Sequence, residues 1–214
     1  MDDAELKLRT ELVDVMQEMD RQGLNHGTAG NASVRCGDGL LITPSGIPPQ
    51  KLSPETIVLI SLDGHYEGKI KPSSEWQMHT GLMKRPDVNA IVHCHSRFAT
   101  TLACAQKSIP PLHYMTAVSG DGEIRLAPYA SFGSAELASH IIETLDGRFA
   151  CLMANHGQIA VASNLSMALM IANEIEVQAS YYYGTLAIGG PQLLSDTEIS
   201  EVLQRFMSYG QQKS

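Results

Sequence analysis

The chain has 214 residues, of which 43% are hydrophobic, and this suits a single domain over residues 1–214 with a substantial core. Its 23 acidic residues outnumber its 15 lysines and arginines, for a formal net charge of −8, which argues against nucleic acid and anionic membranes as partners. An acidic first segment, no apolar stretch long enough to span a bilayer and four scattered cysteines without a CxxC pair predict a cytoplasmic protein with free thiols.

Hydrophobic periodicity and turn residues divide the chain into alternating strands and helices. In chain order, we predict a helix (5–22), a loop running into a strand (27–35), a strand (40–43), a hairpin (56–68), a helix (74–84), a strand (89–95), a helix (96–105), a strand (123–129), a helix (134–146), a strand pair (150–162) and two helices (165–188 and 195–210). The first helix ends at Gly23, the hairpin turns at Asp63-Gly64, and serines cap the helices at Ser74, Ser134 and Ser195 or Asp196.

This element order predicts the fold class. Strands alternate with helices, without internal repeats or linkers, so a central sheet with helices on both faces fits best. The hairpins exclude a purely parallel sheet. We therefore predict a three-layer α/β/α fold with a central mixed, mostly antiparallel sheet flanked by helices.

The stretch "IVHCH", residues 91–95, places two histidines at the end of an apolar strand. Alternate side chains of a strand share a face, so His93 and His95 would point the same way and Cys94 the other way. This is how a strand presents two nitrogen ligands to one metal ion. The other interpretation is an unrelated pair, one buried and one exposed, and these five residues leave both open.

A third histidine, His156, stands at a strand turn before Gly157, which permits close approach of the backbone. Three histidines with an open position are typical of a catalytic zinc site. Glu75 follows two serines at a helix start, where an acidic residue is also favoured by the helix dipole alone. His79 lies on the same helical face as Glu75, either as a ligand partner or, as we expect, as a buried, hydrogen-bonded histidine.

Three short stretches of small residues, "GTAGN", "TPSG" and "PSSE", offer hydroxyl groups and free backbone N–H groups. Turns of this kind form concave nests for phosphate oxygens. The chain contains neither a Walker motif nor GxGxxG, so a nucleotide is not implied. Each stretch alone is a turn, but three of them beside an HxH pair suggest a phosphorylated substrate.

Eight motifs follow one another in order: "GTAGNASVR", "LITPSGIP..KL", "PSSEW..H", "VHCHS", "IP..HYM", "APYASFG", "NHG" and "LSD.EI". In this combination the chain resembles the class II aldolase family, which includes fuculose-phosphate aldolases and ribulose-phosphate epimerases. The resemblance extends from about Leu6 to Tyr209. Two departures, Asn155 where the family often has another histidine and Cys94 where asparagine is familiar, leave every ligand in place.

The resemblance implies one zinc ion per subunit on His93, His95 and His156, with Glu75 as a fourth, displaceable ligand and as the acid/base. It implies that Tyr114 reaches the site of a neighbouring subunit in a cyclic homotetramer. The implied phosphate pocket consists of Asn31, Ser45, Gly46, Ser73 and Ser74. The implied aldehyde pocket consists of Phe132, Phe206 and Tyr209.

The activity implied by the resemblance is reversible cleavage of a ketose 1-phosphate to dihydroxyacetone phosphate and a small aldehyde. L-Fuculose 1-phosphate, which yields L-lactaldehyde, is the default substrate, and 5-deoxy- or 5-methylthio-ribulose 1-phosphate is the alternative. Family members with the same histidines also include decarboxylases, dehydratases and epimerases of sugar phosphates, although "SSEW" argues against an epimerase. A non-catalytic scaffold would have lost the ligands, which are present here. A cupin would place its glutamate after the HxH pair, whereas Glu75 precedes it.

Overall fold

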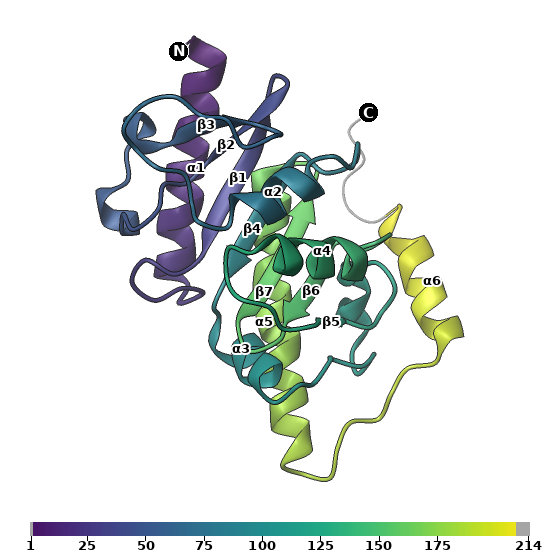
Figure 1. Ribbon diagram of the computed structural model, residues 1–214. Coiled ribbons are helices and arrows are strands. Elements are labelled where there is room, and N and C mark those ends of the chain that lie inside the picture. Colours follow the sequence, from purple (N-terminus) through teal and green to yellow (C-terminus); the bar gives the residue numbers. More distant parts are fainter. Residues whose placement is uncertain (1, 209–214) are drawn as a thin grey trace.

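A seven-stranded sheet forms the centre of the computed structural model, which describes residues 2–208 (Figure 1). Its strands are β1 (Asn31–Cys36), β2 (Gly39–Ile42), β3 (Val58–Ser61), β4 (Ala90–Cys94), β5 (Leu126–Ala127), β6 (Ala150–Met153) and β7 (Gly157–Ala162). They follow the spatial order β3-β2-β1-β4-β7-β6-β5, and among these neighbours the pair β5 and β6 alone is parallel. The prediction of a mixed, mostly antiparallel sheet is therefore confirmed.

Helices cover both faces of this sheet. They are α1 (Asp3–Arg21), α2 (Trp76–Leu82), α3 (Arg97–Cys104), α4 (Ala135–Thr144), α5 (Leu165–Leu186) and α6 (Asp196–Phe206). One apolar cluster joins α1, α3 and α5 to one face, and a second joins α2 and α4 to the other, over which Figure 1 shows them lying. This confirms the three-layer α/β/α prediction. Within residues 2–208, no helix combines the length and apolarity needed to cross a membrane.

The central strand β4 is buried on both faces, which explains its unbroken apolar character. Ala90, Val92 and Cys94 belong to the cluster beneath α1 and α5, whereas Ile91 belongs to the cluster beneath α2 and α4. Alternation along the strand then places His93 on the same face as Ile91. His93 is therefore fully buried, on the face of the sheet that α2 covers.

The predicted start of α2 needs a correction. Ser74 does not cap the helix: Glu75 occupies the N-cap position, its side chain makes no cap hydrogen bond, and the helix runs over Trp76–Leu82. Ser73 Oγ instead accepts a hydrogen bond from the backbone N–H of Glu75 at 3.3 Å. The Glu75 carboxylate is thereby left to face the sheet. The serine caps predicted at the start of α4 and α6 are confirmed by the side-chain hydrogen bonds of both helices.

Two predicted strands are much shorter in the structure. The hairpin over residues 56–68 has β3 as one arm, but the other arm contributes a single bridge, between Ile60 and Tyr66. The segment 123–129 pairs with β6 only through Leu126–Ala127. Pro128 follows at once and has no N–H to donate, which stops further ladder bonds on that side.

Antiparallel pairing brings the functional motifs to one end of the sheet. Asn31, at the start of β1, pairs with His93, and Gln158, near the start of β7, pairs with Cys94. The loops before β1 and β7 therefore meet the segment that leaves β4. An isolated bridge between Pro44 and Pro72 adds the segments "TPSG" and "PSSE" to the same end.

The segment leaving β4 continues into α3, whose N-terminus is held by a side chain of α5. Both carboxylate oxygens of Glu176 accept backbone N–H groups, from Phe98 at 2.8 Å and Ala99 at 2.9 Å. Ser96, the N-cap residue, makes no side-chain cap bond, so Glu176 satisfies these donors in its place.

We expect Glu176→Ala to lower the free energy of unfolding by about 1–2 kcal/mol, the usual loss for a helix cap. Glu176→Gln should lose less, because its carbonyl oxygen can still accept one of the two N–H groups. Urea unfolding followed by circular dichroism measures both, with the exposed Glu201→Ala as the control. An unchanged midpoint in Glu176→Ala would contradict this role for the carboxylate.

Candidate metal centre

Strand β4 delivers two imidazoles to one point. His93 is the penultimate residue of β4 and His95 follows the strand, and their Nε2 atoms lie 3.1 Å apart. Cys94, between them, points into the apolar core on the opposite face. The backbone N–H of His95 donates to Asn25 Oδ1 at 3.1 Å, which holds the residue in place after the ladder ends. This arrangement agrees with strand alternation rather than with an unrelated pair.

The turn between β6 and β7 delivers the third imidazole. Asn155 takes the left-handed conformation, with φ of 55°, and turns the chain so that His156 faces β4. A Cβ atom on Gly157 would lie 2.4 Å from the carbonyl oxygen of Cys94, so a side chain there would force the two strands apart. Glycine is therefore required at this position by close backbone packing, as its place in the sequence suggests.

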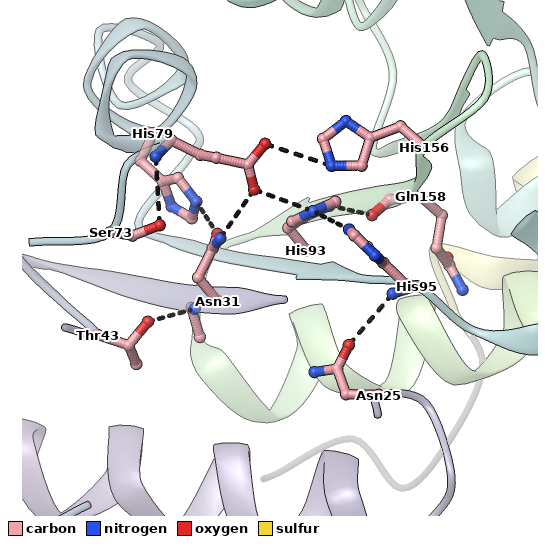
Figure 2. A network of polar contacts seen from close by, with 11 residues as sticks. Asn25, Asn31, Thr43, Ser73, His79, His93, His95, His156 and Gln158 are labelled. Atoms are coloured by element: carbon pink, nitrogen blue, oxygen red, sulfur yellow. Dashed lines mark hydrogen bonds and ion pairs between the residues drawn. The ribbon is translucent and has the colours of Figure 1, made fainter. Parts of the chain in front are cut away.

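The three imidazoles form a compact triangle. Their ring centroids lie 4.9 Å apart for His93 and His95, and 4.8 Å from His156 in both other pairs. One nitrogen of each ring lies within 4.8 Å of the other two. Figure 2 shows His95 and His156 pointing toward His93 from different segments of the chain.

Glu75 completes the group from the N-terminal end of α2. Its Oε2 lies 3.2 Å from His93 Nε2, and its Oε1 lies 3.3 Å from His156 Nε2. Asn31 Nδ2 donates to Oε2 at 3.0 Å. Burial opposes ionisation of Glu75, but the nearby histidines and the Asn31 hydrogen bond outweigh it and hold the pKa of this carboxyl well below its usual range.

The protonation states of His95 and His156 suit metal ligands. Burial, helped by the charge of His93, lowers the pKa of His95 to about 3 and that of His156 to about 4, so both are neutral at pH 7. Burial also opposes charge on His93, but Glu75 outweighs it and raises the pKa of this imidazole. The carbonyl oxygen of Gln158 accepts from His93 Nδ1 at 2.8 Å, which leaves Nε2 to face the group.

The donor set fits a divalent cation. Nitrogens 3.1 Å apart can share only one proton, and a third nitrogen and a carboxylate face the same point. Glu75 Oε1 is buried and has no hydrogen-bond donor within the described residues. A cation would satisfy this oxygen and the converging lone pairs together. Zinc prefers ligands of this kind, three imidazoles with one carboxylate. In such a set the carboxylate position can be exchanged for another ligand.

A cleft of about 400 Å³ opens beside these ligands. All five residues assigned to a phosphate pocket from the sequence line it, together with Phe132, Glu75, His95 and His156. Two backbone hydrogen bonds join the walls: Ser45 N–H donates to Lys71 O at 3.0 Å, and Ser73 N–H donates to Thr43 O at 2.9 Å. Among the described residues that line the cleft, none is lysine or arginine.

Among the lining residues that were not assigned from the sequence, three have polar side chains: Thr28, Tyr129 and Asn155. Thr28 belongs to the "GTAGN" stretch and Tyr129 to "APYASFG", so their motifs were noted without these side chains being singled out. Asn155 Oδ1 accepts from Gln106 Nε2 at 2.6 Å, a contact between residues 49 positions apart that no local pattern indicates.

The structure keeps two predicted site residues away from the cleft of their own chain. Tyr114 begins a 3₁₀ helix over Tyr114–Ser119, is 50% exposed, and stacks near the ring of His113 at 4.6 Å between centroids. Phe206 is the last residue of α6, which packs against that 3₁₀ helix. Neither lines the cleft, and Tyr209 lies outside the described residues.

His79 is fully buried and hydrogen-bonded at both ring nitrogens, as expected from its place on α2. Burial lowers its pKa to about 3, so the ring is neutral at pH 7. It is not one of the histidines whose nitrogens converge. The interpretation of Glu75 and His79 as a ligand pair therefore has no support in the geometry.

Comparison with known proteins gives a consistent result. The family model described as "Class II Aldolase and Adducin N-terminal domain" matches residues 10–183. An L-fuculose phosphate aldolase of Escherichia coli is 49% identical over 207 residues, which cover 95% of this chain and 96% of that protein. A 5-methylthioribulose-1-phosphate/5-deoxyribulose-1-phosphate aldolase of Rhodospirillum rubrum is 46% identical over 211 residues, which cover 98% of this chain and 96% of that protein.

The fold also matches a solved structure. An L-fuculose 1-phosphate aldolase superimposes with a TM-score of 0.91 at 38% identity, over 94% of this chain and 96% of the other. The similarity thus includes the sheet, both helical layers and the end of the sheet where the histidines converge.

Proposed function

The chain belongs to the class II aldolase and adducin N-terminal domain family, and we propose that it is a zinc-dependent aldolase that reversibly cleaves a ketose 1-phosphate to dihydroxyacetone phosphate and a small aldehyde. The observation that carries this proposal is the convergence of three imidazole nitrogens and the Glu75 carboxylate at one side of a cleft rich in hydroxyl groups. Two relatives, whose sequences are 46% and 49% identical to this chain, are named as aldolases of such phosphates.

In this proposal His93, His95 and His156 would hold one zinc ion per subunit, with Glu75 as a fourth, displaceable ligand. A bound zinc ion supplies a Lewis acid that stabilises negative charge developing on substrate oxygens. The three histidines would hold the zinc ion beside the cleft, and in this way orient its charge toward the substrate. Gln158 keeps the ring of His93 in place through its carbonyl oxygen.

The phosphate group would lie against Ser45, Gly46, Ser73 and Ser74, with Asn31 beside them. The turn containing Gly46, with φ of 72°, lets the backbone curve around an anion. Because no lysine or arginine lines the described cleft, hydroxyl and backbone N–H groups would carry the binding, despite the net charge of −8. An unphosphorylated ketose should therefore be a much poorer substrate.

Glu75 would move the proton at C3 of the substrate. In synthesis the Glu75 carboxylate removes the C3 proton. In cleavage the C3–C4 electron pair passes to an enediolate, which takes a proton at C3 from Glu75 in its protonated form, and the proton that the C4 hydroxyl group loses balances the one gained at C3. Oε2 already accepts from Asn31, whereas Oε1 has no hydrogen-bond donor among residues 2–208, so Oε1 is the oxygen that would carry the proton. Burial raises the pKa of Glu75, and the charge of His93 is a main cause of its low value; zinc would hold His93 neutral and so favour proton uptake by the carboxylate.

The C4 hydroxyl group must lose its proton as it becomes the aldehyde, and we assign this step to Tyr114 of a partner subunit in a homotetramer. Tyr114 is 50% exposed and lies outside the cleft of its own chain, so it is available to another copy. The paired prolines Pro110 and Pro111 favour an extended segment before it. Each active site would then be built from two chains.

Mixing two inactive proteins tests the shared site. We expect activity to return when Tyr114→Phe and His95→Ala subunits exchange, because some mixed sites combine intact histidines from one chain with an intact phenol from the other. Native mass spectrometry confirms exchange, and self-mixing of each variant is the control. Confirmed exchange without activity would show that each site is built within one chain.

The aldehyde is the open choice within this proposal. Phe132 lines the cleft and is 74% exposed, so it can pack against a small apolar tail, and we assign Phe206 and Tyr209 to the same pocket from the family resemblance. We propose L-fuculose 1-phosphate as the substrate, with 5-deoxy- or 5-methylthio-ribulose 1-phosphate as the alternative. Relatives named for each class have 49% and 46% identity to this chain, a difference too small to choose between them.

A substrate panel tests the proposed function directly. Protein loaded with zinc is incubated with each of the three ketose 1-phosphates and with unphosphorylated L-fuculose, and release of dihydroxyacetone phosphate is coupled to a reductase. We expect cleavage of at least one phosphate ester and little of the free sugar. If none is cleaved, decarboxylase, dehydratase and epimerase assays on sugar phosphates follow.

We also propose a reducing, cytoplasmic location, which agrees with the four free cysteines.

A further inference from the structure

A buried chain of hydrogen bonds leads from Glu75 into the protein interior, away from the cleft. Asn31 Nδ2 lies 3.0 Å from Glu75 Oε2, and Asn31 Oδ1 lies 2.6 Å from His79 Nε2. On its other side, His79 Nδ1 lies 2.7 Å from Ser33 Oγ. Figure 2 shows the His79 ring beside the amide of Asn31, to the left of the three converging histidines. His79 and Ser33 are fully buried, so solvent cannot substitute for either partner.

The direction of each hydrogen bond follows from the carboxylate. An ionised Glu75 can only accept, so the Asn31 atom facing it must be the amide nitrogen. The carbonyl oxygen of Asn31 then faces His79 and needs a donor, which requires the proton of the neutral ring on Nε2. His79 Nδ1 must therefore accept, and Ser33 donates to it. The opposite direction would set an amide oxygen against a carboxylate oxygen and leave both without a donor.

We propose that His79 is a positioning residue for the reaction: with its ring held at Nδ1 by Ser33, it donates from Nε2 to the Asn31 amide and orients it so that Asn31 holds Oε2 of Glu75. This inference rests on the proposed function of Glu75 as acid/base. His79 touches neither substrate nor metal in this arrangement, and it acts through Asn31. The result is a carboxylate held at one oxygen, with the other oxygen turned toward the reacting group.

This chain of bonds also changes the expected role of Asn31. The sequence resemblance places Asn31 in the phosphate pocket, and the residue does line the cleft. Its side-chain oxygen and one N–H are already engaged by His79 and Glu75. Asn31 therefore serves chiefly to position the carboxylate, and phosphate recognition depends on the serines and Gly46.

Two substitutions of His79 separate positioning from simple packing. In His79→Gln the side-chain amide nitrogen reaches the place of Nε2 and can still donate to Asn31. In His79→Asn the shorter amide reaches the place of Nδ1, contacts Ser33, and leaves Asn31 without its donor. Both variants remove the buried ring, so both should lose stability to a similar extent.

We expect His79→Asn to lower kcat roughly 10–100-fold, the usual loss when a group supporting a site residue is removed. KM for the ketose phosphate and the zinc content should stay near those of the unmodified protein. His79→Gln should retain most of the kcat. Equal loss of kcat in the two variants, or loss that follows thermal stability, would overturn the proposal in favour of packing alone.

A second measurement does not depend on activity. A long-range ¹H–¹⁵N spectrum of the intact protein at pH 7 identifies the protonated nitrogen of His79, whose signals are those missing in His79→Gln. We expect the proton on Nε2 alone, and the same tautomer in Ser33→Ala, because the Asn31 carbonyl oxygen still requires this proton. A proton on Nδ1 would overturn the assignment. If the spectrum is as expected but no ketose 1-phosphate is cleaved, the proposed function fails and the hydrogen-bond arrangement stands.

Discussion

Replacing Glu75 with glutamine should lower the rate of proton transfer by roughly 10²-fold or more, the contribution typical of a positioned acid/base. The amide has nearly the same shape, and its oxygen can still accept from Asn31, so the fold and the phosphate pocket should persist. It cannot take up a proton at neutral pH, and for that reason the loss should appear in kcat rather than in phosphate binding. This separation makes Glu75→Gln a sharper test than truncation.

Exchange of the C3 proton of dihydroxyacetone phosphate with D₂O isolates this step, because it requires neither the aldehyde nor cleavage of a carbon–carbon bond. Proton NMR follows the exchange at a fixed concentration of zinc-loaded protein. Glu136→Gln, an exposed glutamate in the first turn of α4, is the matched control and should exchange at the unmodified rate. Exchange at the unmodified rate in Glu75→Gln would move the proton transfer to another group.

Removing one histidine should have the largest effect of all. We expect the purified protein to carry about one zinc ion per chain at Zn–N distances of ~2.0–2.1 Å. In His156→Ala, only two nitrogen ligands remain, His93 and His95 at the end of β4. The zinc content and the activity should therefore both fall close to background. His156 comes from a separate turn, so its removal leaves the β4 segment and its ladder intact.

Elemental analysis after gel filtration measures this prediction, and circular dichroism checks that the variant is folded. His65→Ala is the matched control, since His65 is exposed in a turn after β3 and should leave the zinc content unchanged. Full zinc occupancy in His156→Ala would rule out the three-histidine assignment, because the remaining pair would then suffice.

Local sequence signals were sufficient to predict much of the secondary structure and the chemical character of the site. Amphipathic spacing predicted α1 and α5 close to their observed bounds, and serines predicted the starts of α4 and α6, because these signals come from residues a few positions apart. Strand alternation likewise predicted that His93 and His95 share a face. The start of α2 was misplaced because Glu75 faces the histidines instead of following the local capping pattern.

The contacts between distant segments could not be predicted from local signals and follow from the tertiary structure. The antiparallel register of β4 with β1 and β7 sets Asn31 and His156 beside His93, and the bridge between Pro44 and Pro72 adds the serine turns. The partners of His79, 46 and 48 positions away in sequence, follow from the same register. Local periodicity reflects neighbouring residues, whereas register depends on packing of both sheet faces at once, so no short motif could have predicted that His79 supports Asn31.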